Sequence, residues 1–170
     1  MNSLCNVSNS TAADIVTISR RRWIVGAGIS FASLPSMAAP TTLPSTASLV
    51  DELAFALKVN NPLVVMVSLE GCPFCKIARE NYLGPMRVQQ GLPVIQIDMR
   101  NRLAIKDMKG ATTTQDDLIR SWGIKVAPTL LFFGRGGVEV AERMVGGYIP
   151  DFYGAYLDER LRVARASLRV

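Results

Sequence analysis

The sequence predicts a single α/β domain built on a four-stranded mixed sheet with flanking helices, and three observations lead to this. Continuous apolar and β-branched runs at 63–69 and 93–98 are typical of strands covered on both faces. A segment with helical signals separates them, so they should form a parallel pair joined by a right-handed crossover. Farther along, "PTLLFF" and "VEVAERMV" are separated by a glycine-rich turn, which predicts an antiparallel hairpin. The expected strand order is 93–98, 63–69, 129–133, 138–145.

The first predicted helix covers about residues 49–58. Ser48 to Asp51 matches a capping box, in which the serine hydroxyl binds a backbone N–H of the first turn. The apolar residues that follow recur at helical spacing: Leu49, Leu53, Ala56 and Leu57. The helix should end at the "NNP" sequence that precedes the first strand.

The second predicted helix begins at Pro73, because proline suits a first helical position. It should bend or stop near Gly84 and Pro85, since proline lacks the N–H that a helix interior requires. The polar stretch 100–115 contains no predicted element. A short helix should follow at about 116–122.

The last predicted helix begins near Pro150 and continues almost to the end of the chain. One apolar face is expected along it, made by Tyr153, Leu157, Leu161, Ala164 and Leu168. Its arginines lie off this face, which is typical of a solvated helix surface rather than an anion-binding site.

Residues 1–38 have the order of an export signal. Three arginines at 20–22 precede about 14 weakly apolar residues, and small residues follow at 36–38. The apolar run is shorter than the ~20 helical residues that cross a membrane, and Pro35 interrupts it, which favours a cleaved signal over an anchor. The segment "SRRRWI" also resembles the twin-arginine signature, although Val25 stands where a lysine is common and the general secretory route stays open.

We expect cleavage after Ala38, which leaves residues 39–47 as a Pro/Thr-rich linker and 48–170 as the domain. Cleavage removes three basic residues and one acidic residue, so the net charge falls from +5 to +3. The weaker positive charge removes most of the support for a nucleic-acid partner. A periplasmic protein is expected, and we predict a monomer.

Cleavage also removes Cys5 and leaves Cys72 and Cys75 as the only cysteines. A structural zinc site needs four Cys or His ligands, and the chain has no histidine, so no resident metal or cofactor is expected. Two thiolates could still bind the soft ion Cu(I). A structural disulfide is disfavoured, because so small a loop has little entropy to remove from the unfolded chain.

The position of the pair favours reversible thiol chemistry. Cys72 directly follows a predicted strand and precedes a predicted helix, where free backbone N–H groups stabilise a thiolate. Cys75 lies one helical turn farther on, within reach of a disulfide. We therefore expect Cys72 to attack a substrate disulfide and Cys75 to resolve the mixed disulfide.

Two separated motifs resemble the thioredoxin superfamily. "VVMVSLEGCPFCK" is similar to its first central strand and active-site segment, and "WGIKVAPTLLFFGRGGVEVAERMVGGY" is similar to the stretch around its cis-proline. The resemblance covers about residues 49–168 and implies the thioredoxin fold. It also implies that Pro128 is a cis-proline facing the cysteines and that Ala127 offers backbone hydrogen bonds to a bound substrate.

Other site residues are candidates of less defined role. Pro73 and Phe74 lie between the cysteines, and Phe74 is expected to be either an exposed contact for substrate or partly packed against the loop. The family carries a buried acid near its cysteines and a lysine close to that acid. By the resemblance, this chain has the apolar residues Met66 and Val94 at those two positions. Glu70 is then the nearest acid, and it is a candidate proton acceptor for Cys75 or a plain exposed turn residue.

The polar stretch 100–115 resembles that of the periplasmic SoxW-like thioredoxins. The sequence therefore predicts an exported thiol:disulfide oxidoreductase, with a lean towards reduction of its partners. The partners would be exported proteins with disulfides or thiols, together with a membrane or periplasmic redox protein. The alternatives are a Cu(I)-binding module or a redox adaptor of the same fold with little turnover.

Overall fold

The computed structural model describes residues 42–147 and 150–169, and the predicted export signal at 1–38 lies outside them. The described residues belong to one compact unit of the chain, Met37–Val170. Within these described ranges, no helix is both long enough and apolar enough to cross a membrane.

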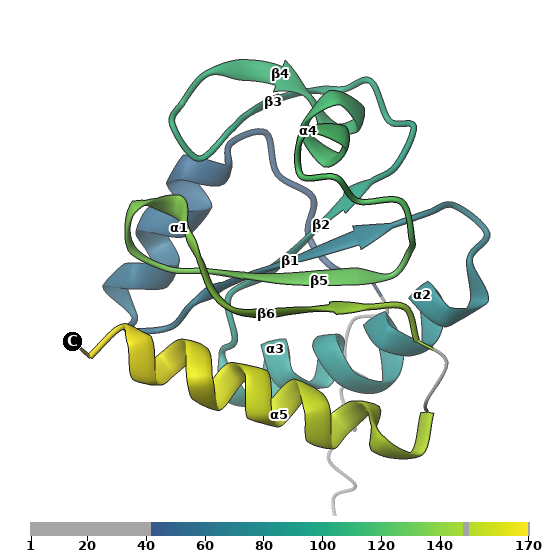
Figure 1. Ribbon diagram of the computed structural model, residues 1–170, viewed down its shortest axis with the longest axis vertical. Helices are drawn as coiled ribbons and strands as arrows, with labels where there is room; N and C mark the ends of the chain where they lie inside the picture. Colours follow the sequence, from purple (N-terminus) through teal and green to yellow (C-terminus); the bar gives the residue numbers. More distant parts are fainter. Residues whose placement is uncertain (1–41, 148–149, 170) are drawn as a thin grey trace, which may run out of the picture. The chain divides into compact units, whose positions relative to one another are not determined.

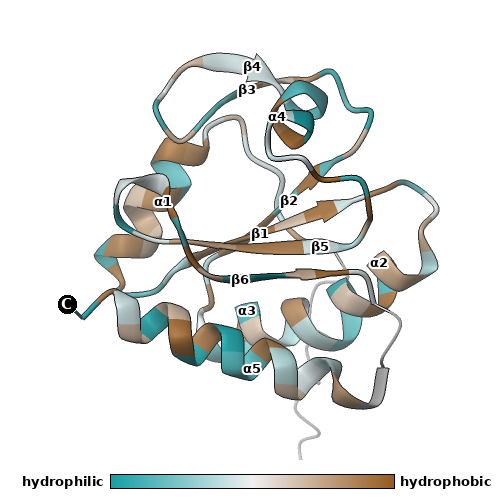
Figure 2. Cartoon of the chain, in the orientation of Figure 1, coloured by the Kyte–Doolittle hydropathy of each residue, from teal (hydrophilic) through white to brown (hydrophobic). Residues whose placement is uncertain are grey.

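The central sheet has the strand order β2-β1-β5-β6, as the sequence predicts (Figure 1). β1 (Leu63–Ser68) runs parallel to β2 (Val94–Asp98) and antiparallel to β5 (Thr129–Phe133). β5 pairs antiparallel with β6 (Glu139–Val145). Every residue of β1 and β5 is buried, which is why these strands carry continuous apolar runs (Figure 2).

Helices cover both faces of the sheet because side chains of a strand point alternately to the two sides. Val64 and Met66 of β1 face a core shared with α2 (Pro73–Ile77) and α5 (Pro150–Ser167). The remaining apolar residues of β1 face α1 (Leu49–Lys58) and α4 (Gln115–Ser121) on the other side: Leu63, Val65 and Val67. Full burial of such a side chain contributes about 1.5–3 kcal/mol.

The predicted capping box at the start of α1 is wrong. Ser48 is the N-cap residue, but its hydroxyl makes no capping hydrogen bond and is buried without a partner. The extended backbone at Ser48 is held instead by Thr46, whose Oγ1 accepts its N–H, and by a bridge to Lys106. A side-chain cap does form at α4, where the Thr114 hydroxyl accepts the N–H of Asp117.

The helix that begins at Pro73 continues beyond the predicted break. A π-helical segment, η1 (Ala78–Leu83), leads from α2 into α3 (Gly84–Gln90). The Gly84 N–H donates to the Arg79 carbonyl, so the wider turn shifts the hydrogen-bond pattern just before Pro85. The distortion therefore lies in the turn before Gly84, and the chain leaves the helix only at Gly91, whose φ is 63°.

Two segments expected to be irregular are ordered parts of the domain. Within 100–115, β3 (Ala104–Lys106) and β4 (Thr112–Thr114) form a small antiparallel sheet of their own. In the described part of the predicted linker, Leu43 is buried in the core and the Pro44 carbonyl accepts the N–H of Gln96. This contact covers part of the outer edge of β2.

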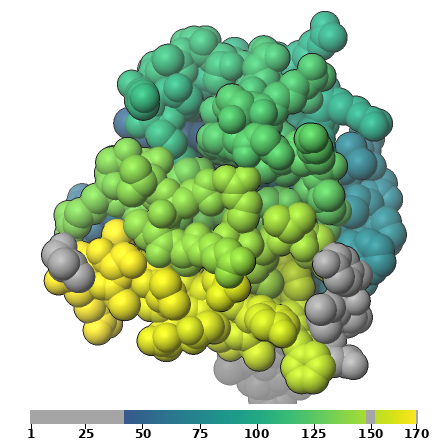
Figure 3. All heavy atoms as spheres, in the orientation of Figure 1, coloured from purple at the N-terminus to yellow at the C-terminus, as the bar shows by residue number. Residues whose placement is uncertain are grey.

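The C-terminal helix α5 packs along β6, as the space-filling view shows in yellow against green (Figure 3). The whole predicted apolar face is buried: Tyr153, Leu157, Leu161, Ala164 and Leu168. The hairpin between β5 and β6 turns through η2 (Arg135–Gly137), where Gly136 and Gly137 have φ values of 72° and 70°. Such values favour glycine, which explains the glycine-rich turn.

Candidate active site

Cys72 lies at the junction that the sequence predicts, where the chain leaves β1 and enters α2. Gly71, with φ of 72°, turns the backbone after the strand, and Pro73 occupies the first helical position. Cys72 is the N-cap residue, and its Sγ accepts the backbone N–H of Cys75 at 3.2 Å. It is half-buried, so its sulfur can be approached from outside while a backbone donor stabilises negative charge on it.

Cys75 differs from Cys72 in its surroundings. It is a free thiol only 1% exposed, and it belongs to the core formed with α5. Burial raises the pKa of the Cys75 thiol from 9.0 to about 11, and its hydrogen bond with Cys72 adds to the rise. The backbone of Leu69 and the hydroxyl of Ser68 act in the opposite direction and lower this pKa. The pair thus combines an accessible sulfur with a buried one.

The loop before β5 lies against Cys72. The peptide bond between Ala127 and Pro128 is cis, as the resemblance predicts. The Cys72 thiol donates a long hydrogen bond to the Ala127 carbonyl, with an S···O distance of 3.8 Å. The loop is held by the Thr129 hydroxyl, which donates to Val126, and by the Gly146 N–H, which donates to the Pro128 carbonyl.

An apolar surface flanks Cys72 on the side of this loop. Phe74 is 45% exposed, so much of its ring faces solvent. A Cβ built on Gly147 would lie 3.2 Å from the Cβ of Phe74 and 3.5 Å from the Cγ of Pro128. Gly147 therefore lies close to both Phe74 and Pro128, and we call these three residues the apolar groove.

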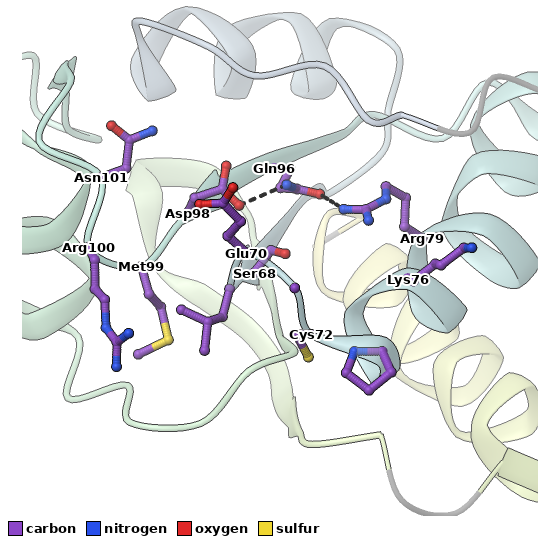
Figure 4. A pocket seen from close by; sticks show the side chains of 13 residues that line it. Ser68, Glu70, Cys72, Lys76, Arg79, Gln96, Asp98, Met99, Arg100 and Asn101 are labelled. Atoms are coloured by element: carbon purple, nitrogen blue, oxygen red, sulfur yellow. Dashed lines mark hydrogen bonds between the residues drawn. The ribbon is translucent and has the colours of Figure 1, made fainter.

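A charged cavity of about 1060 Å³ lies on the other side of Cys72, at the carboxyl ends of β1 and β2 (Figure 4). Among the side chains that line it are Ser68, Glu70, Cys72, Lys76, Arg79 and Asp98. Both signs of charge are present, so the cavity is a polar region open to water rather than an apolar ligand pocket. In the described ranges, no three Cys, Asp or Glu side chains are grouped so as to hold a metal ion.

A hydrogen-bond chain fixes one wall of the charged cavity. Arg79 donates through Nη1 to Gln96 Oε1 at 2.7 Å, and Gln96 donates through Nε2 to Asp98 Oδ1 at 2.8 Å (Figure 4). The backbone N–H of Asp98 in turn donates to Oε1 of the buried Gln115. This chain ties η1, β2 and α4 together and holds the charged groups in place.

The structure brings most of the predicted site residues together. Cys75 and Ala127 contact Cys72, Pro73 starts the helix behind it, and Phe74 and Pro128 both lie close to Gly147. Glu70 lies exposed at the turn and lines the charged cavity, but it is not among the groups that shift the pKa of Cys75.

Sequence reasoning missed two polar residues near Cys75. Ser68 is 2% exposed and interacts with the thiol from the end of β1. Tyr153 faces Cys75 from α5, and burial raises the pKa of its phenol. The alternation of Val64, Met66 and Ser68 along β1 could have indicated that Ser68 shares the face that α2 covers.

Comparison with protein families supports the fold. A family model described as a thioredoxin-like domain matches residues 49–160. No curated protein sequence matches the chain.

The chain is also similar to solved structures at low sequence identity. DsbH oxidoreductase is 16% identical with a TM-score of 0.51, and the match covers 80% of this chain and 95% of that one. Poplar thioredoxin h is 22% identical with a TM-score of 0.45, covering 64% and 85% of the two chains. The periplasmic thioredoxin SoxS from Paracoccus pantotrophus is 19% identical with a TM-score of 0.41, covering 61% and 98%.

Proposed function

The chain belongs to the thioredoxin-like domain family, and from this premise we propose that it is an exported thiol:disulfide oxidoreductase acting through Cys72 and Cys75. The observation that carries the proposal is the asymmetry of the two sulfurs. Cys72 is accessible and accepts a backbone N–H at a helix start, whereas Cys75 is buried behind it. An accessible nucleophile with a shielded resolving thiol is the arrangement that disulfide exchange requires.

The proposed reaction has two steps. Cys72, as thiolate, attacks one sulfur of a partner disulfide; the partner's S–S bond breaks, and its other sulfur leaves as a thiolate that takes up a proton. Cys75 then loses its proton and attacks Cys72, which forms the intramolecular disulfide and releases the second partner thiol. Two electrons pass from the cysteine pair to the partner, and the reverse sequence oxidises a partner dithiol.

We propose that the partners are exported proteins, bound along the apolar groove with the Ala127 backbone holding an extended segment. Phe74 supplies exposed apolar contact next to the reactive sulfur, and the half-buried Gly147 lies close to both Phe74 and the buried Pro128. We favour the reducing direction because the polar stretch 100–115 resembles SoxW-like thioredoxins. A separate redox protein would then return electrons to the pair.

Reduction of insulin disulfides tests the activity directly. The wild-type protein should be active, Cys72→Ser inactive, and Cys75→Ser should accumulate a mixed disulfide because its resolving thiol is missing. Full activity of Cys72→Ser would overturn the proposal. The reduction potential of the pair, measured together with its redox state in cells, tests the direction: an oxidising potential with an oxidised pair would contradict a reductase.

The same preparation tests the copper-binding alternative. Protein purified with stoichiometric copper that depends on both cysteines, and without insulin reduction, would indicate a Cu(I) module. Export is tested by the N-terminal sequence of the processed protein. We expect it to begin after Ala38, and replacement of Arg20 and Arg21 by lysine should block export if the twin-arginine route is used.

A further inference from the structure

Cys75 must lose its proton before it attacks the mixed disulfide. Because Cys75 is buried, this proton needs a route to water. Cys75 lies in the hydrophobic core between the sheet, α2 and α5, to which β1 contributes Val64 and Met66. Met66 cannot accept a proton. Any route for the proton must therefore pass through one of the few polar groups that reach the thiol.

Within residues 42–147 and 150–169, three polar side chains face Cys75, each from a different part of the fold. Cys72 is the reaction partner itself and is bonded to the substrate at this stage. Tyr153, from α5, is 6% exposed; its hydroxyl is buried without a hydrogen-bond partner, and its ring packs against Tyr82 at a centroid distance of 4.9 Å. Ser68, from β1, is the third.

Ser68 is the polar residue that also lines the water-accessible side of the site. It is the last residue of β1, two positions beyond Met66, so its side chain shares the strand face covered by α2. It is 2% exposed, yet it lines the charged cavity together with Glu70 and Asp98 (Figure 4). Its carbonyl accepts the N–H of Met99 at 2.8 Å, which holds the strand end in place.

We propose that the Ser68 hydroxyl links Cys75 to the charged cavity and carries the thiol proton out during the resolving step. The inference rests on the proposed exchange reaction. The S–H proton of Cys75 passes to the Ser68 oxygen, and the hydroxyl proton of Ser68 passes to water in the cavity. Ser68 then donates a hydrogen bond to the new thiolate, which attacks Cys72 as the bond from Cys72 to the partner sulfur breaks.

The charged groups of the cavity surround the water end of this route. Glu70 and Asp98 carry negative charge, and Lys76, Arg79 and Arg100 carry positive charge. Arg79 and Asp98 are tied through Gln96, so their charges are fixed on one wall. A proton released there reaches solvent without crossing the apolar core.

Reaction of the reduced protein with 5,5′-dithiobis(2-nitrobenzoate) separates the two steps. Attack by Cys72 releases the first thionitrobenzoate, and resolution by Cys75 releases the second. In Ser68→Ala we expect an unchanged first phase and a second phase slower by about ten- to a hundredfold, the effect of removing a hydrogen bond to a charged group. The pH midpoint of the second phase should also rise by about one unit.

Three variants serve as controls. Ser68→Thr keeps the hydroxyl and should retain most of the second-phase rate. Ser48→Ala removes a buried, unpartnered hydroxyl next to α1 and should leave both phases unchanged. Tyr153→Phe removes the other hydroxyl that faces Cys75 and should leave the pH midpoint in place.

The outcomes distinguish this inference from the proposed function. If the wild-type protein shows no first phase, the exchange reaction itself fails. If the first phase is normal but Ser68→Ala leaves the rate and pH midpoint of the second phase unchanged, the role of Ser68 is wrong. If Tyr153→Phe slows the second phase and Ser68→Ala does not, the proton of Cys75 leaves through Tyr153 and the role of Ser68 is wrong.

Discussion

The two sides of Cys72 differ in polarity. On one side the apolar groove presents Phe74 to solvent, and Gly147 lies close to both Phe74 and the buried Pro128. On the other side lies the charged cavity, whose wall is fixed by hydrogen bonds from Arg79 through to Asp98. The difference suggests a division of roles, in which partners bind on the apolar side and protons leave on the charged side.

The largest effect is expected from filling the apolar groove. In Gly147→Leu the new side chain must displace Phe74 or occupy the groove, because even its Cβ would lie 3.2 Å from the Cβ of Phe74. The blocked groove would lose contacts with the partner, so kcat/KM for insulin should fall about ten- to a hundredfold. Steady-state kinetics with insulin measures the loss.

A small disulfide provides the contrast for this variant. Hydroxyethyl disulfide has too little surface to use the groove, so its reduction by Gly147→Leu should change much less than that of insulin. Gly147→Ala should give an intermediate result. Equal losses with both substrates would mean that the substitution damages the cysteine pair, and the groove would not be the partner site.

A second prediction concerns how the burial of Cys75 makes the stability of the reduced protein depend on pH. Its pKa rises from 9.0 to about 11, mainly through burial. Between these values the unfolded chain releases the proton while the folded protein keeps it, so stability present below about pH 9 is lost as the pH rises towards about 11. The loss should be at most about 1.4 kcal/mol per pH unit.

Denaturant unfolding of the reduced protein at about pH 8 and about pH 10.5 checks this dependence. Cys75→Ala should lose less stability over the same interval. Burial also raises the pKa of Tyr153, which changes the stability in the same direction. Tyr153 is present in both proteins, so its contribution cancels in the comparison. Identical losses in the two proteins would show that folding does not raise the pKa of Cys75.

Removal of the exposed ring on the apolar side should have a smaller effect. Phe74→Ala should raise KM for insulin about three- to tenfold with little change in kcat, because the ring contributes contact area and takes no part in bond exchange. Phe55→Ala on α1 is the matched control, since Phe55 is 56% exposed and α1 covers the opposite face of the sheet. A similar rise in KM for both variants would mean that the apolar groove is not a specific binding site for insulin.

The smallest effect is expected for Glu70→Gln on the charged side. The Glu70 carboxylate is exposed, where charge interactions are weak, so the second phase of the dithiobis(nitrobenzoate) reaction should slow by less than about threefold. This tests the candidate proton acceptor that the sequence indicates. A loss larger than that of Ser68→Ala would mean that Glu70 takes the proton of Cys75 directly.

Local sequence patterns were sufficient to predict the main architecture. Buried apolar runs identified the strands of the sheet, and the spacing along α5 identified its buried face, because both signals depend on neighbours within one element. The position of Cys72 between a strand and a helix start also follows from adjacent residues. The same reasoning missed β3 and β4, which are only three residues long, and it assigned Ser48 a capping bond that it does not make.

By itself the sequence therefore determined the order of the main helices and sheet strands and the location of the two cysteines. Only the tertiary structure decided what surrounds each sulfur. Ser68, Tyr153 and Cys75 come from three elements, and Phe74 meets Gly147 across a long stretch of chain. Burial, hydrogen-bond partners and the shift of the Cys75 pKa arise from contacts between distant segments, and such contacts have no periodicity in the sequence.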